Sequence, residues 1–160
     1  MFTIINKSNN PYYNLAFEEY VLKNIVTDED IILLWRNEPT VVVGRNQNTY
    51  EEINYDYLLK NNINVVRRIS GGGAVYHDLG NINFTFITNT TTIIKALETL
   101  GINATFSGRN DILVNDKKFS GNAQYFYKKR MFQHGTLLFD TNLNMISKVL
   151  NLDPSKVMSK

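Results

Sequence analysis

Short apolar or alternating runs recur along this chain, and turn residues separate them. Runs of this kind are typical of β-strands, in which successive side chains alternate between two faces. They predict strands at 2–6, 31–36, 40–43, 64–69, 82–87, 111–114, 117–126 and 131–139. Only Asn115 and Asp116 separate the strands predicted at 111–114 and 117–126, so these two are expected to form a hairpin.

The longest predicted helix follows a capping sequence. Side-chain acceptors at 8–10 can cap a helix, and a proline at position 11 is tolerated in its first turn. Apolar residues then recur at helical spacing, at Leu15, Phe17, Val21, Leu22 and Ile25. We expect these to form the buried face, and Glu18, Glu19 and Lys23 to face water. Shorter helices are predicted at 53–61, 91–100 and 143–150, the second ending before Gly101.

Strands outnumber helices in this prediction, and several neighbouring strands are joined by short turns. This pattern favours an α+β domain, with a mixed and largely antiparallel sheet packed with helices, over a doubly wound parallel sheet. The 160 residues suit one domain, since domains commonly span about 100–200 residues. Hydrophobic residues make up 43% of the chain, with nine Tyr and nine Phe, and this apolar surface excludes a disordered chain.

Composition excludes several functional classes. The 17 Lys and Arg residues against 15 Asp and Glu give a net charge of +2, which does not indicate a nucleic-acid binder. The absence of cysteine excludes disulfide scaffolds, thiolate zinc sites and cysteine nucleophiles within these residues. No run approaches the roughly 18 apolar residues of a membrane span, and no secretory signal opens the chain. We therefore expect a soluble cytoplasmic protein that binds neither nucleic acid nor membrane.

The segment at 67–78 carries the most chemistry. Arg67 and Arg68 precede a serine and three consecutive glycines at 70–73. Glycines let a ligand approach the backbone closely, and a loop of exposed amides can hold an anion such as phosphate. The two arginines can add forked contacts to phosphate or carboxylate oxygens. We expect an anion-binding loop at a strand end, although the pattern is neither a Walker loop nor a dinucleotide fingerprint.

A second group of residues lies in the predicted hairpin. Asp111 and Lys118 fall on neighbouring strands, where a carboxylate could hold a hydrated Mg²⁺ and an ammonium could hold a phosphate. Lys117 and Lys118 face opposite sides of a regular strand, so only one of them can point into a site. The alternative interpretation of this segment alone is a surface hairpin with solvated lysines.

Other candidate residues are weaker. Trp35 follows an apolar run, which is typical of a core residue, and His77 and His134 are the two histidines. Two histidines without a nearby carboxylate cluster do not indicate a metal site. Ser70 and Ser120 lie beside glycines but outside a Gly-x-Ser-x-Gly motif, so no serine–histidine–acid arrangement is predicted. The basic run at 128–130 is expected to be a solvated turn.

These segments together resemble a known family. The chain is similar to the N-terminal part of the catalytic domain of lipoate–protein ligase A, in the biotin/lipoate ligase superfamily. The matching stretches follow the family's order, at 10–19, 34–36, 43–48, 67–81, 108–111, 118–123 and 134–138. The stretch around Asp111 and Lys118 also resembles biotin–protein ligases, which carry a different arginine–glycine loop.

The resemblance implies a class II synthetase-like catalytic domain and a two-step reaction. Lipoate attacks the α-phosphate of ATP to give lipoyl-adenylate and pyrophosphate, and a lysine of an acceptor domain then attacks the adenylate and releases AMP. The acceptors implied are lipoyl domains, such as the glycine cleavage H protein and the acyltransferase subunits of 2-oxoacid dehydrogenases. Family members continue well past residue 160, so we expect residues 1–160 to be the N-terminal portion of the catalytic domain.

The resemblance also assigns roles to residues. Lys118 is the expected catalytic residue, bridging the carboxylate and the α-phosphate. The residues expected to bind ATP and lipoyl-adenylate are Arg68, Ser70, Gly71, Gly72, Gly73, Ala74, Val75, Tyr76 and Lys118. The lipoate pocket is expected to include Trp35, Gly72, His77 and His134, and Asp111 is the candidate Mg²⁺ ligand.

Two other functions remain open at this point. One is an ATP-independent octanoyl or lipoyl transferase of the same fold, which passes the acyl group through a cysteine thioester. The absence of cysteine from this chain argues against it. The other is a non-catalytic module that binds lipoate or the acceptor domain.

Overall fold

Seven strands form the larger of two β-sheets in this computed structural model, which describes residues 1–25, 27–88, 104–107, 111–114 and 117–151. For residues 88, 104–107, 111–114 and 117–119 it describes the backbone alone. In spatial order the strands are β1 (Phe2–Ile5), β2 (Ile31–Trp35), β6 (Asn81–Thr88), β10 (Arg130–Leu138), β9 (Lys117–Tyr127), β8 (Asp111–Val114) and β7 (Ala104–Ser107). Only β1 and β2 are parallel; the other neighbours in this sheet are antiparallel.

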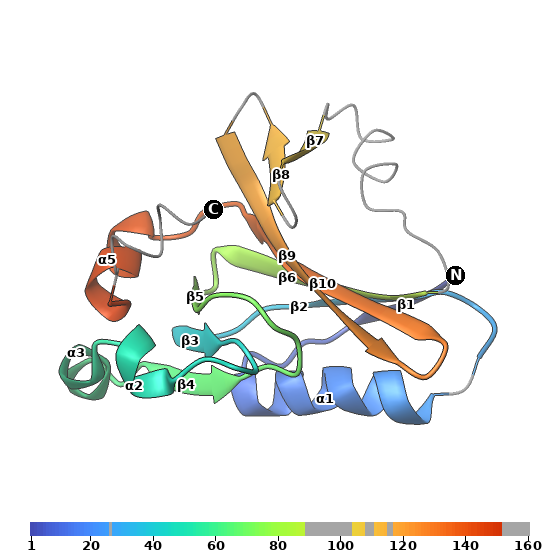
Figure 1. Cartoon of the computed structure of the whole chain (residues 1–160), viewed down its shortest axis with the longest axis horizontal. Coiled ribbons are helices and arrows are strands. Elements are labelled where there is room, and N and C mark those ends of the chain that lie inside the picture. Colours follow the sequence, from blue (N-terminus) through green and yellow to red (C-terminus); the bar gives the residue numbers. More distant parts are fainter. Residues whose placement is uncertain (26, 89–103, 108–110, 115–116, 152–160) are drawn as a thin grey trace.

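A smaller sheet packs beside the first. Its strands are β4 (Asn64–Arg67), β3 (Thr40–Val43) and β5 (Val75–His77), with β3 parallel to β4 and antiparallel to β5. Short helices gather at its outer end in Figure 1: α2 (Thr49–Glu52), α3 (Tyr55–Lys60), the 3₁₀ helix η1 (Leu143–Met145) and α5 (Ile146–Val149). A buried apolar cluster joins these parts, namely Val41, Val43, Ile53, Leu58, Ile63, Tyr76 and Val149.

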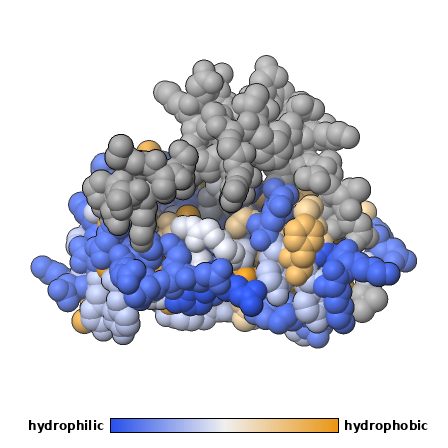
Figure 2. Space-filling model, viewed as in Figure 1, coloured by the Kyte–Doolittle hydropathy of each residue, from blue (hydrophilic) through white to orange (hydrophobic). Residues whose placement is uncertain are grey.

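Helix α1 (Pro11–Asn24) runs beneath the larger sheet in Figure 1. The side chain of Asn10 accepts a hydrogen bond from the Tyr13 N–H at 3.0 Å, and Pro11 begins the helix, as the capping sequence predicts. Val21 and Leu22 pack against residues of β2, β6 and β10, which forms a second apolar cluster with Ile31, Ile87 and Phe132. Figure 2 shows that the face in this view is mostly hydrophilic, with small hydrophobic patches.

The turn between β9 and β10 departs from the prediction of a fully solvated basic run. Lys128 and Lys129 are exposed, but Arg130 Nη1 donates to the carbonyls of Leu22 and Ile25, at 3.0 and 2.7 Å. The last carbonyls of a helix lack partners within the helix, so a cation there is stabilising. Arg130 therefore anchors α1 to the sheet.

The predicted α+β class and mixed, largely antiparallel sheet are confirmed, and so is the 111–126 hairpin. Strands β5 and β7 were not predicted, and the segment 143–150 divides into a 3₁₀ turn and a short α-helix. The helix predicted at 53–61 is shorter, because Ile53 forms an antiparallel bridge to Leu150. The helix predicted at 91–100 lies outside the described residues. None of the described helices combines the length and apolarity needed to cross a membrane.

Candidate functional site

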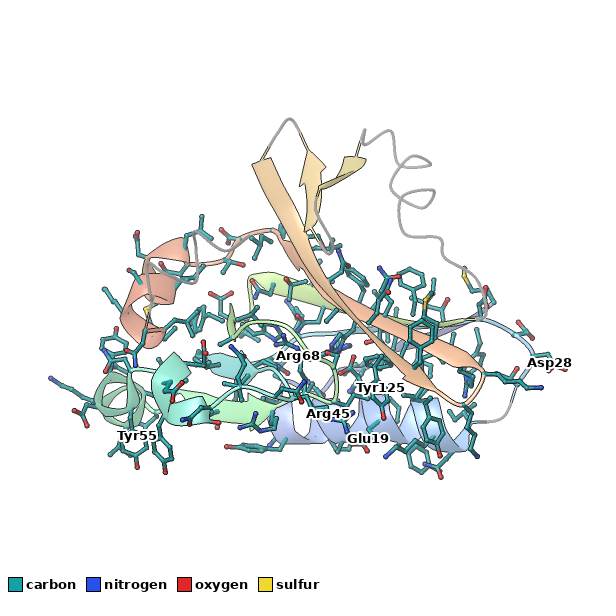
Figure 3. All side chains as sticks on the ribbon, in the orientation of Figure 1. Glu19, Asp28, Arg45, Tyr55, Arg68 and Tyr125 are labelled. Atoms are coloured by element: carbon teal, nitrogen blue, oxygen red, sulfur yellow. The ribbon has the colours of Figure 1, made fainter. Side chains whose placement is uncertain are left out.

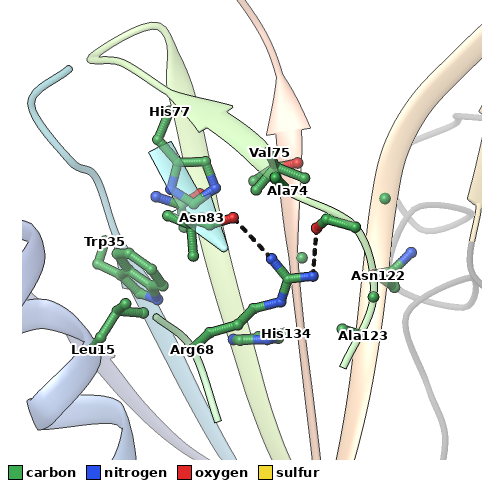
Figure 4. Close-up of a pocket in the computed structure, with 16 residues that line it drawn as sticks. Leu15, Trp35, Arg68, Ala74, Val75, His77, Asn83, Asn122, Ala123 and His134 are labelled. Carbon is green, nitrogen blue, oxygen red and sulfur yellow. Dashed lines mark hydrogen bonds between the residues drawn. The ribbon is translucent and has the colours of Figure 1, made fainter. Parts of the chain in front are cut away.

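A pocket of about 280 Å³ lies where the smaller sheet and its glycine loop face the larger sheet (Figure 4). Such a volume suits a small organic ligand. The wall on the side of the smaller sheet comprises Val42, Arg68, Gly72, Gly73, Ala74, Val75 and His77. The wall on the side of the larger sheet and α1 comprises Leu15, Trp35, Asn83, Gly121, Asn122, Ala123, His134, Gly135 and Thr136.

One row of paired residues crosses the larger sheet through the pocket. Trp35 pairs with Asn83, Asn83 with Thr136, and Thr136 with Gly121, and all four line the pocket. Gly121 pairs in turn with Asp111 on β8. Directly opposed residues occupy the same face of a sheet. The register therefore assigns Asp111, which is described by its backbone alone, to the face of the sheet that carries the pocket.

A β-bulge decides the register position of Lys118. Leu113 pairs with Lys118, whereas Asp111 pairs with Gly121, so β9 contains one residue more than β8 over this stretch. Leu113 and Asp111 are two residues apart and share a face, so Lys118 takes a position on that face. Without the extra residue, strict alternation would assign Lys118 to the opposite face. The prediction that Asp111 and Lys118 lie on neighbouring strands is confirmed.

Arg68 shapes the glycine loop through backbone carbonyls. Its Nη2 donates to the Gly71 and Gly73 carbonyls at 2.8 and 2.7 Å, its Nε donates to Gly71 at 3.1 Å, and its Nη1 donates to Val42 at 3.2 Å. The guanidinium is buried, and burial lowers its pKa to about 10, so it stays charged at neutral pH. Gly72 adopts a φ of +98°, which side chains rarely tolerate. The loop thus presents a buried positive charge to the pocket.

The expectation that both arginines serve one anion is wrong for Arg67. Successive residues of a strand point to opposite sides, and Arg67 lies on the side away from the pocket. Its Nη1 donates to the carbonyls of Gly44, Arg45 and Gln47, and its Nη2 donates to Thr49 Oγ1 at 2.6 Å. Arg67 therefore fixes the loop after β3. Arg45 of that loop lies 5.6 Å from the ring centroid of Tyr125 on β9 (Figure 3), a cation–π contact between the two sheets.

Glu18 is buried, which overturns the expectation that it faces water. It accepts a very short hydrogen bond from Thr85 Oγ1, and Trp35 Nε1 donates to Thr85 Oγ1 at 3.1 Å. His134 Nδ1 lies 3.2 and 3.4 Å from the two carboxylate oxygens of Glu18. A buried carboxylate is tolerated only where such donors surround it, and the helical period of α1 does not reveal these donors.

The sequence motifs did not reveal a serine–histidine–glutamate hydrogen-bonded arrangement that the structure contains. Ser70 Oγ lies 2.5 Å from His134 Nε2, while the other nitrogen of His134 faces Glu18. The three residues come from the glycine loop, β10 and α1, so no local motif could reveal the arrangement. Ser70 has no exposed surface, so its hydroxyl cannot attack a ligand in the pocket. The chain of hydrogen bonds orders the pocket wall.

His77 lines the pocket with an uncharged ring. Burial, with smaller contributions from the charges of Arg68 and His134, lowers its pKa to about 3. Its Nδ1 lies 3.2 Å from Asn37 Nδ2, and its ring meets that of Trp35 edge-on with centroids 6.1 Å apart. His77 Nε2 and both amide atoms of Asn83 are buried without a partner among the described residues. Ligand atoms are the natural partners for such groups at a pocket wall.

The fold brings most of the sequence-predicted residues to one place. Trp35, Gly72, His77 and His134 line the pocket, as do Arg68, Gly73, Ala74 and Val75. Of the remaining loop candidates, Ser70 is buried behind the wall, and Tyr76 belongs to the apolar cluster of the smaller sheet. Gly71 accepts from Arg68. The sequence analysis did not assign the lining residues Leu15, Val42, Asn83, Gly121, Asn122, Ala123, Gly135 and Thr136 to the site, although some lie in the motif stretches.

The pocket combines apolar and aromatic walls, which also carry the polar side chains of Asn83, Asn122 and Thr136, with one positively charged group. Apolar and aromatic side chains supply the walls, while the buried Arg68 and the glycine loop supply a positive, amide-rich end. Among the residues whose positions are described, no three histidines, aspartates or glutamates gather closely enough to hold a metal ion. A Mg²⁺ held by one carboxylate and by substrate phosphates needs no such cluster.

Comparison with known proteins identifies the relatives of this chain. Residues 10–160 match the family described as "Lipoyl protein ligase A/B catalytic domain". Lipoate–protein ligase 1 of Staphylococcus aureus is 49% identical over 97% of this chain and 51% of its own length. Lipoate–protein ligase LplJ of Bacillus subtilis is 48% identical over 95% of this chain and 50% of its own length. The chain thus spans about half the length of the curated relatives it matches.

Solved structures with a fold similar to that of this chain include lipoate–protein ligases. Plasmodium falciparum LipL1, in complex with lipoate, has a TM-score of 0.84 at 34% identity, over 98% of this chain and 54% of that chain. A bipartite lipoate–protein ligase from Thermoplasma acidophilum, described with its E2 lipoyl domain, has a TM-score of 0.85 at 30% identity, over 97% and 68%. Lipoate–protein ligase A bound with ATP has a TM-score of 0.83 at 29% identity, over 98% and 73%.

Proposed function

This chain belongs to the lipoyl protein ligase A/B catalytic domain family, and from that membership we propose that it activates lipoate with ATP. The carboxylate of lipoate attacks the α-phosphate of ATP, so that a C(O)–O–P bond forms and the bond to pyrophosphate breaks. A lysine amine of an acceptor domain then attacks the acyl carbon, and AMP leaves. We place this reaction in the cytoplasm, which supplies ATP.

The pocket behind the glycine loop is the observation that carries this proposal. Its apolar walls fit the lipoyl chain, and its positive end holds the carboxylate and the phosphates. Arg68 donates hydrogen bonds to the Gly71 and Gly73 carbonyls, so these oxygens point toward the guanidinium. The related structures carry lipoate in one case and ATP in another, which supports the assignment of both substrates.

Lys118 is the proposed catalytic residue. Its ammonium would neutralise the charge that develops between the carboxylate and the α-phosphate, and such preorganised stabilisation is typically worth ~3–4 kcal/mol. The register at the bulge supports this role, because it puts Lys118 and Asp111 on the face that carries the pocket. Asp111 would hold a Mg²⁺ whose charge offsets the phosphates of ATP.

The proposed acceptors are lipoyl domains. The Thermoplasma relative is described together with its E2 lipoyl domain, which supports this class of partner. The acyltransferase subunits of 2-oxoacid dehydrogenases and the glycine cleavage H protein are the specific acceptors we propose. Each would present one lysine to the acyl-adenylate.

Exchange of labelled pyrophosphate into ATP tests the first step. In the presence of lipoate and Mg²⁺, we expect exchange by the unaltered chain and a loss of at least about 100-fold in Lys118→Ala. Lys117→Ala is the matched control, because it removes the adjacent lysine, and we expect its exchange rate to stay within about twofold of the unaltered chain. Equal rates in the two variants would remove Lys118 from its role.

A further inference from the structure

Backbone carbonyls fix the orientation of Asn14, a buried asparagine in helix α1. Asn14 Nδ2 lies 3.0 Å from the Ser8 carbonyl and 2.8 Å from the Arg36 carbonyl. Carbonyl oxygens only accept, so this atom of Asn14 must be its donating NH₂ group. The same NH₂ group lies 2.9 Å from a side-chain atom of Asn37, which must therefore be the oxygen of Asn37.

The orientation of Asn37 in turn fixes the proton of His77. With its oxygen facing Asn14, Asn37 turns its NH₂ group toward His77 Nδ1 at 3.2 Å. Nδ1 must accept this hydrogen bond, so the ring proton of the neutral imidazole sits on Nε2. Burial is the main reason why His77 does not take up a second proton, and Arg68 and His134 make smaller contributions that lower its pKa in the same direction.

The resulting Nε2–H group belongs to the pocket. His77 lines the pocket, and its Nε2 is buried without a partner among the described residues. Trp35 and His134 line the same pocket, and Figure 4 shows His77 near the Trp35 ring. His77 thus offers an uncharged hydrogen-bond donor to whatever fills the pocket, in a wall that also carries the side-chain amide of Asn83, likewise unpartnered within the described part of the chain.

We propose that Asn37 is a positioning residue that fixes His77 as a neutral N–H donor, and that this donor selects a sulfur-bearing acyl chain over a plain alkyl chain. The inference rests on the proposed function, which puts an acyl group in this pocket. It predicts a preference for lipoate over octanoate that comes from a hydrogen bond between His77 and a ring sulfur, rather than from pocket volume alone.

The physical reason is that a buried donor left without an acceptor destabilises a complex by more than a formed hydrogen bond stabilises it. A dithiolane sulfur is a weak acceptor and also makes favourable contacts with aromatic rings such as those of Trp35 and His134. An octanoyl chain has no acceptor at its apolar end, so it would cover the His77 donor and leave it unpaired. A site built to make a hydrogen bond rejects an analogue that lacks the partner atom.

Asn37→Asp tests the inference with an almost isosteric change. One carboxylate oxygen can still accept from Asn14, but the other now faces His77 Nδ1 and requires a proton there. His77 then has two states: an imidazolium that keeps the Nε2–H donor, and, above its pKa, a neutral ring whose Nε2 is a bare acceptor. The donor toward the pocket is therefore lost as the pH rises in the variant, and is kept in the unaltered chain.

The readouts are histidine nitrogen NMR and the ratio of two dissociation constants. The chain has two histidines, so ¹⁵N-histidine labelling reports two rings, and the titration of His77 in the variant sets one pH below and one above its pKa. Lipoate and octanoate are titrated into the whole chain at both pH values. Asn144→Asp, the same change at an exposed residue, is the control for added negative charge.

In the unaltered chain, we expect the proton of the His77 ring to be on Nε2. We also expect its dissociation constant for octanoate to be at least about fivefold larger than that for lipoate at both pH values. In Asn37→Asp, the ratio of the octanoate to the lipoate dissociation constant should equal that of the unaltered chain below the pKa of His77. Above that pKa, the ratio should fall toward unity. A ratio that does not change with pH in this variant overturns the inference and leaves the proposed function intact. If neither acid binds the unaltered chain, the pocket assignment fails, and the proposed function fails with it.

Discussion

Arg68 Nη2 donates to the Gly73 carbonyl at 2.7 Å, and the same atom donates to the Gly71 carbonyl at 2.8 Å. One planar guanidinium thus holds the glycine loop in place by hydrogen bonds to two of its carbonyls. The charge of the guanidinium faces the pocket. The sequence suggests that this arginine contacts a ligand. The structure shows that it first shapes the loop that the ligand meets.

Replacing Arg68 by Lys should therefore damage both stability and ligand binding. Lysine keeps the charge but lacks the planar fork, so some of the Gly71, Gly73 and Val42 carbonyls lose their donors. We expect the free energy of unfolding to fall by about 2–3 kcal/mol, measured by urea denaturation. The affinity for ATP should fall at least about tenfold. Arg36→Lys, a change at an exposed arginine, should alter neither quantity.

The three glycines of the loop should respond differently to substitution. Gly72 has a φ of +98°, and a Cβ there would lie 2.8 Å from Arg68 Nη2, so Gly72→Ala should cost about 1–2 kcal/mol of stability. A Cβ at Gly71 or Gly73 meets nothing within 4 Å. Gly71→Ala should leave stability unchanged, and Gly73→Val should leave it unchanged while weakening ATP binding, because Gly73 lines the pocket.

Denaturation curves and nucleotide titrations on the three variants check this contrast. A Gly72→Ala chain as stable as the unaltered one would contradict the loop geometry. Full ATP affinity in Gly73→Val would contradict the assignment of this loop to the nucleotide.

Local sequence signals predicted most of the strands, the fold class and the loop, because each depends on neighbours in the chain, whereas they missed the short strands β5 and β7. The helical period of α1 predicts its apolar face through Val21 and Leu22, and the structure confirms that face. The same period puts Glu18 in water, since no local signal reveals that Thr85 and His134, far along the chain, provide its hydrogen-bond donors. The bulge that decides on which face of the sheet Lys118 lies is likewise a property of strand pairing, so the composition does not reveal it.

Glu18 should be replaceable by Gln but not by Ala. Gln keeps an oxygen for Thr85 and His134 at nearly the same volume. Ala leaves both donors unpaired and opens a cavity, so we expect it to lower the free energy of unfolding by about 3–5 kcal/mol. Urea denaturation of the two variants measures the difference. If Glu18→Gln and Glu18→Ala lowered the free energy of unfolding equally, the hydrogen bonds to Glu18 would contribute little to stability.

The buried neutral His77 should make stability depend on pH. Its folded pKa of about 3 lies below the 6.5 of a free histidine, so the unfolded chain binds the proton more tightly. Its contribution is fully present above 6.5 and is lost as the pH falls toward 3, at about 1.4 kcal/mol per pH unit within that window. Unfolding free energies at pH 7, 6 and 5 measure the slope. In His77→Gln this part of the slope should disappear, and an unchanged slope would show that His77 is not the group responsible.

The central claim is that this chain forms an acyl-adenylate from lipoate and ATP in the pocket behind its glycine loop. Mass spectrometry of the purified chain, incubated with ATP, Mg²⁺ and lipoate, tests it most directly. We predict that lipoyl-adenylate and pyrophosphate appear together, require all three additions and disappear in Lys118→Ala. The account would be contradicted if lipoate binds while ATP remains intact, or if an octanoyl or lipoyl group reaches an acceptor domain without ATP.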